Sequence, residues 1–96
     1  FGDPPYNVKI PQIVGRGRTK HKNFAMASGE MSPAAFTKFL VEAFASAVKY
    51  SVDGALHYIC IDWRHYGELL DAGTQLYDEL LNVVVWCKTN GGQGSF

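Results

Sequence analysis

The sequence has no apolar run long enough to cross a membrane and no recognisable signal peptide, although 47% of its residues are hydrophobic. These two absences favour a cytoplasmic protein without a membrane partner. Cysteine is scarce: Cys60 and Cys87 are the only two, each in an apolar, strand-like run without metal-ligating neighbours. We therefore expect buried free thiols rather than a disulfide, and no metal site.

The net charge is zero, but positive and negative residues are unevenly distributed along the chain. Residues 1–24 carry a net charge of +4 and residues 25–96 a net charge of −4. The positive charge gathers in a stretch rich in glycine and polar residues within residues 7–31, which we call the basic loop. Cations on a flexible loop suit contact with DNA phosphates, and a solvated loop is the alternative. The residues expected to bind DNA are Arg16, Arg18, Lys20 and Lys22.

Only four prolines occur, and two of them stand together in the opening hexapeptide Phe1–Tyr6. Proline fixes φ and lacks an N–H, so the carbonyls of Asp3 and Pro4 cannot be absorbed into a helix. Beside the Asp3 carboxylate they make two or three acceptors that converge on one small donor, such as an exocyclic NH2 group. Tyr6 can stack on the ring that carries this amine. An ordinary Pro-Pro turn at the end of a strand is the other interpretation.

The tetrapeptide Asp3-Pro4-Pro5-Tyr6 resembles the (Asp/Asn/Ser)-Pro-Pro-(Tyr/Phe/Trp) catalytic motif of the amino-DNA methyltransferases. Residues 58–65 and 85–96 also look like segments of bacterial and phage-type DNA modification methylases. The resemblance implies methyl transfer from S-adenosylmethionine to adenine N6 of a flipped base in double-stranded DNA. It implies catalytic roles for Asp3, Pro4, Pro5 and Tyr6, with Asp3 also near the cofactor and Phe96 as a second aromatic wall against the DNA base. It further implies a cytoplasmic protein of bacterial or phage origin.

The order of predicted elements favours an α/β fold. Ser32 is a good N-cap with Pro33 at the first helical position, and apolar residues then recur at helical spacing. Buried strands are expected over residues 55–61 and 83–87, with a helix over residues 66–81 between them. We predict part of a Rossmann-like methyltransferase fold, with a mostly parallel sheet flanked by helices. The helical stripe is Phe36, Phe39, Leu40, Ala43, Phe44, Ala47 and Val48.

Two polar groups in this pattern need an explanation. Residues 62–65, Asp-Trp-Arg-His, follow the first expected strand, where ligands collect in open α/β sheets. The alternative is that Asp62 caps the next helix while Trp63 packs on that helix. His57 interrupts the apolar run, and a hydrogen-bonded structural histidine is the favoured interpretation.

The sequence departs from the family in lacking its Phe-x-Gly-x-Gly cofactor motif. Residues 1–96 are thus expected to be a single piece, the catalytic half, of a methyltransferase domain whose remainder binds the cofactor. The open edge of residues 83–87 predicts a possible homodimer. Three alternative functions stay open: an N4-cytosine DNA methyltransferase, an RNA or protein-glutamine methyltransferase, and a non-enzymatic nucleic-acid-binding module.

Overall fold

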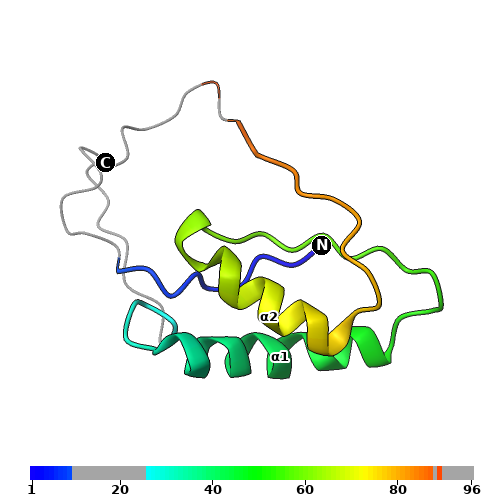
Figure 1. The fold of residues 1–96 in the computed structure, drawn as a ribbon, viewed down its shortest axis with the longest axis horizontal. Coiled ribbons are helices and arrows are strands. Elements are labelled where there is room, and N and C mark those ends of the chain that lie inside the picture. Colours follow the sequence, from blue (N-terminus) through cyan, green and yellow to red (C-terminus); the bar gives the residue numbers. More distant parts are fainter. Residues whose placement is uncertain (10–25, 88, 90–96) are drawn as a thin grey trace.

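The structure is a computed structural model that describes residues 1–9, 26–87 and 89. Its elements are the α-helix α1 (Pro33–Lys49), the short 3-10 helix η1 (Trp63–His65) and the α-helix α2 (Tyr66–Leu76). The two α-helices lie against each other, and the N-terminal segment runs beside the extended segment that leads into η1 (Figure 1). The elements form a small helical layer with extended chain on one side.

Helix α1 begins where the sequence predicts. The Ser32 hydroxyl oxygen accepts a hydrogen bond from the Ala35 N–H at 3.2 Å, and Pro33 occupies the first helical position. This cap satisfies one of the N–H groups that a helix start leaves without a partner. The prediction of a helix start at Ser32 is confirmed.

The core lies between α1 and α2 and is small. Phe36 and Leu40 of α1 are fully buried, with Ala72 of α2 and Ala27 of the preceding loop against them. The Phe36 ring also meets the His65 ring edge-on, with centroids 5.2 Å apart. The predicted stripe on α1 therefore provides the core, although its later turns are less covered than its first two. The partly buried residues around this core are Met31, Phe39, Val41, Phe44, Ile61 and Leu69.

The second helix is shorter than predicted. It ends at Leu76, and Tyr77 adopts an extended backbone with φ −118° and ψ 153°. The Tyr77 hydroxyl lies 2.9 Å from His57 Nδ1, so this side chain is held by the extended segment instead of the helix. Leu80 and Leu81, which the prediction places at the end of this helix, are 62% and 64% exposed.

The predicted parallel sheet is wrong. Within the described residues there is no β-strand, and the sole pairing is an isolated parallel bridge between Gly2 and Ile59. The Gly2 N–H donates to the Tyr58 carbonyl at 2.7 Å, and the Cys60 N–H donates to the Gly2 carbonyl at 2.8 Å. A strand needs a hydrogen-bonding neighbour along its edge, and an apolar run alone does not supply one.

The second expected strand, residues 83–87, also lacks a pairing neighbour among the described residues. Residues 83–87 are extended, but form no backbone hydrogen bond to the described part of the chain, and Figure 1 shows them leading away from the helices. The side chains of residues 83–86 are 55–79% exposed. Cys87 is exposed and Cys60 half-buried, both as free thiols, so the expected burial of Cys87 is wrong.

Candidate functional site

The Asp3–Tyr6 corner is anchored by the bridge at Gly2. Parallel pairing sends the chain after Gly2 and the chain after Ile59 out in the same direction. A side chain at position 2 would force the Phe44 ring of α1 to shift, because a Cβ there would lie 2.8 Å from Phe44 Cε1. The bridge and this close approach fix the point from which the Asp3 carboxylate emerges.

Within the corner, the Tyr6 hydroxyl donates a hydrogen bond to Asp3 Oδ1. Asp3 is exposed and Tyr6 is half-buried. Burial, then the hydrogen bond and the negative charge of Asp3, raise the pKa of Tyr6 well above its ordinary value, with smaller contributions from Cys60 and Asp62. The phenol therefore stays protonated at neutral pH and remains a donor to the carboxylate.

A second polar group lies at the same end of the bridge. The Asp62 carboxylate caps η1 by accepting from the Arg64 N–H at 3.0 Å, and both of its oxygens lie 3.2 Å from Arg64 Nη1. The Arg64 guanidinium carbon lies 5.1 Å from the centre of the Trp63 ring. Asp62 thus takes the capping role of the alternative interpretation, at η1 instead of α2. Trp63 is 79% exposed, so its predicted packing on the helix is wrong.

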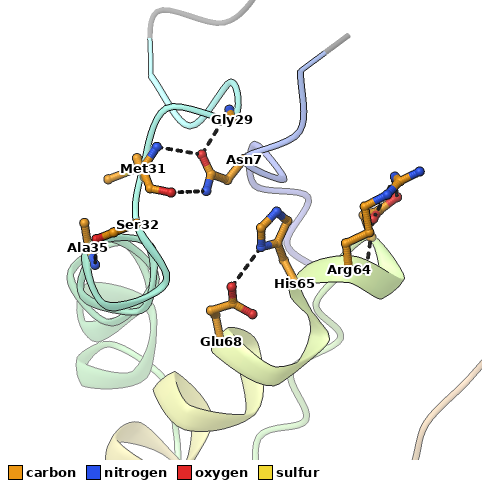
Figure 2. A network of polar contacts seen from close by, with 9 residues as sticks. Asn7, Gly29, Met31, Ser32, Ala35, Arg64, His65 and Glu68 are labelled. Atoms are coloured by element: carbon orange, nitrogen blue, oxygen red, sulfur yellow. Dashed lines mark hydrogen bonds and ion pairs between the residues drawn. The ribbon is translucent and has the colours of Figure 1, made fainter. Parts of the chain in front are cut away.

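Asn7, directly after the corner, holds the two ends of the basic loop together (Figure 2). Its Nδ2 donates to the Met31 carbonyl at 2.8 Å, and its Oδ1 accepts from the N–H groups of Gly29 and Met31 at 3.0 and 3.1 Å. Asn7 is 3% exposed and has φ +53°, a left-handed conformation that Asn tolerates better than most residues. This role is not predicted from the sequence, where its one signal is an asparagine directly after a Pro-Pro-Tyr turn.

A second set of hydrogen bonds lies at the C-terminal end of the basic loop. The Glu30 carboxylate accepts from the N–H groups of Ala27 and Ser28 at 2.5 and 2.6 Å. Hydrogen bonds from backbone N–H groups, first its own and then those of Ser28 and Ala27, lower the pKa of Glu30. Ala27 is buried with φ +52°, so the carboxylate stabilises a turn that alanine seldom adopts.

His57 has two hydrogen-bond partners and a structural role. The Ser51 hydroxyl donates to the Ala47 carbonyl at 2.7 Å, so it accepts from His57 Nε2 at 2.8 Å. In the neutral ring, Nδ1 then accepts from the Tyr77 hydroxyl at 2.9 Å. These bonds tie the ends of α1 and α2 to the extended segment, and they leave Ser51 without an activating base.

His65 pairs with Glu68 at the start of α2. His65 Nδ1 lies 2.9 Å from Glu68 Oε1, and both side chains are largely buried (Figure 2). The hydrogen bond from His65 is the main cause that lowers the pKa of Glu68. This pair orients the imidazole whose ring packs on Phe36.

The structure describes the predicted catalytic residues Asp3, Pro4, Pro5 and Tyr6 as one continuous corner. The predicted DNA contacts lie outside the described residues: Arg16, Arg18, Lys20, Lys22 and Phe96. The structure brings Asp62 and its partner Arg64 to the same end of the Gly2–Ile59 bridge as Asp3.

The pocket that the described residues form beside the bridge is small. A pocket of about 130 Å³ opens there, whereas cofactor sites are typically about 300–1,000 Å³. This pocket is too small for S-adenosylmethionine, and Asp3, the expected cofactor contact, is not among the residues that line it. Among the described residues there is no cluster of three or more metal-ligating side chains, and none of their helices has the length and apolar content to cross a bilayer. The pocket is lined by Phe1, Gly2, Phe44, Ala47, His57, Tyr58 and Ile59.

Comparisons with protein-family models, with curated proteins and with solved structures found no match to this chain.

Proposed function

We propose that this chain carries the amine-accepting corner of a DNA methyltransferase, which methylates adenine N6 and belongs to the cytoplasm of a bacterium or phage-infected cell. One observation supports this most directly: the Asp3 carboxylate accepts a hydrogen bond from the Tyr6 hydroxyl, so an acceptor and an aromatic ring lie within reach of one another. An exocyclic amine of a base stacked on Tyr6 offers the same kind of donor to the same carboxylate.

The corner acts by positioning and by electrostatics. The Asp3 carboxylate and the Pro4 carbonyl accept the two N–H bonds of the amine, which draws the nitrogen lone pair out of conjugation with the ring. Asp3 would also stabilise the positive charge that appears on nitrogen as its bond to the methyl carbon forms and the bond from that carbon to the donor's sulfur breaks, until the nitrogen loses one of its protons. Tyr6 holds the base by stacking, as aromatic side chains do for unpaired bases. The target amine is paired in the duplex, so the base must be flipped out first.

The methyl donor in this proposal is S-adenosylmethionine, which supplies an electrophilic methyl group when bound. Since the pocket beside Gly2 does not fit it, we assign to the described residues the amine-binding half of the reaction only. The same proposal includes binding of the methyl donor by other residues and binding of double-stranded DNA by the basic loop. Asn7 supports that role for the loop, because it holds the ends of residues 7–31 next to the corner.

Replacing Asp3 tests the proposal. The variant Asp3→Ala, made in the full polypeptide, is expected to lower the rate of methyl transfer to DNA by about 100-fold or more. DNA binding is expected to persist, because phosphate contacts do not involve this carboxylate. Asp53→Ala is the control, since Asp53 is an exposed carboxylate in the turn after α1. Equal activity in both variants contradicts the role of Asp3, and binding without any activity in the parent favours a non-enzymatic module.

A further inference from the structure

Trp63 and Arg64 form an exposed aromatic–cation pair at the same end of the bridge as Asp3. The chain runs parallel on the two sides of Gly2 and Ile59, so Asp3 and residues 62–64 leave the bridge in one direction. The Asp62 charge also contributes to the raised pKa of Tyr6, which places the two groups within electrostatic reach.

Other residues hold the Trp63–Arg64 pair in place. Asp62 holds the Arg64 guanidinium with both carboxylate oxygens at 3.2 Å and caps the turn that carries Trp63. The guanidinium carbon then lies 5.1 Å from the Trp63 ring centre, where a cation is attracted by the π-face. Arg64 covers one face of the ring, and with the side chain 79% exposed the opposite face is open.

Exposure alone does not distinguish Trp63, because Trp86 is also 79% exposed. Trp86 lies in the extended segment 83–87, where the described residues give it neither a capped turn nor a cation on its ring. Trp86 therefore provides a matched control of the same residue type and the same exposure.

We propose that Trp63 is a stacking platform for a second nucleobase, the neighbour of the base held at the Asp3–Tyr6 corner. This inference rests on the proposed function, since a base that leaves the stack exposes the face of its neighbour. An aromatic ring replaces the lost stacking partner without regard to sequence. Arg64 keeps the ring in place and brings a positive charge toward the phosphate between the two bases.

The test uses tryptophan fluorescence. The variant Trp86→Phe leaves Trp63 as the single tryptophan of the chain. Titration with a single-stranded oligonucleotide of mixed sequence is expected to quench its emission to saturation, and the anisotropy of a labelled oligonucleotide measures binding independently. Trp63→Ala is expected to weaken binding about 5- to 100-fold, whereas Trp63→Phe keeps most of it. Circular dichroism of each variant shows whether the helices are retained.

Three results would contradict the stacking role of Trp63. They are binding of the oligonucleotide without quenching, equal affinity of Trp63→Ala and the parent, and no binding at all. Asp3→Ala separates this inference from the proposed function, because it removes the amine acceptor and leaves Trp63 in place. Quenching without methyl transfer in the parent contradicts the proposed function alone, and methyl transfer without quenching contradicts the platform alone.

Discussion

The Tyr6 hydroxyl donates its hydrogen bond to the Asp3 carboxylate and thereby occupies an acceptor of the corner that a substrate amine needs. The phenol is protonated at neutral pH, and burial and the adjacent carboxylate raise its pKa further above the ordinary value of 10.0. A substrate amine must therefore displace the hydroxyl while its base stacks on the ring. The two parts of Tyr6, ring and hydroxyl, act in opposite directions on substrate binding.

Removing only the hydroxyl tests this relationship. Tyr6→Phe keeps the ring and frees the Asp3 carboxylate, so we expect a KM for DNA equal to or up to about tenfold below that of the parent. Tyr6→Ala loses the stacking surface and is expected to raise KM about 5- to 100-fold. Steady-state methyl-transfer kinetics measure both. An equal loss in the two variants shows that the hydroxyl serves the substrate instead of competing with it.

Asn7 is expected to be the most sensitive polar position outside the corner. Asn7→Ala removes the partner of three backbone groups, those of Gly29 and Met31, and each buried group left unpaired costs about 1–3 kcal/mol. Chemical denaturation is expected to show a loss of at least about 2 kcal/mol. Asn82→Ala is the control, because the Asn82 side-chain oxygen Oδ1 accepts from the Val83 N–H at an exposed site. Similar losses in both variants contradict a special role for Asn7.

Replacement of Gly2 by alanine is expected to lower the stability of the fold. Gly2→Ala brings a Cβ within 2.8 Å of the Phe44 ring, and overpacking of this kind typically costs about 1–3 kcal/mol. Gly67→Ala is the matched control, since nothing lies within 4 Å of a Cβ there and alanine favours the helix. Thermal melts compare the two. A combined Gly2→Ala, Phe44→Leu variant is expected to recover part of the loss, and no recovery places the strain elsewhere.

The His65–Glu68 pair predicts a dependence of stability on pH. The pKa of Glu68 in the folded state lies below the ordinary value of 4.5, so the Glu68 carboxylate stabilises the fold above that pH. This contribution is lost as the pH falls from about 4.5 through the folded pKa. Glu68→Gln should therefore flatten the fall in the free energy of unfolding over that range. Denaturation at a series of pH values measures it, and an unchanged slope in the variant contradicts the prediction.

The sequence predicts the first helix well because its signals are local. Ser32 and Pro33 define its start, and the spacing of Phe36 and Leu40 defines its buried face. The sheet is not predictable in this way, because Val83–Cys87 reads as a buried strand only if another segment pairs with it. The corner at Asp3–Tyr6 is predicted from proline stereochemistry, whereas the closure of the basic loop by Asn7 depends on contacts 22 and 24 residues away.

The most direct measurement is the identity of the methylated product. The full polypeptide is incubated with labelled S-adenosylmethionine and mixed-sequence duplex DNA, and the nucleosides are then separated. We expect label in N6-methyladenine, and none with Asp3→Ala. Label in N4-methylcytosine keeps the role of Asp3 and Tyr6 but changes the base. Label in RNA or protein, with none in DNA, contradicts the proposed function.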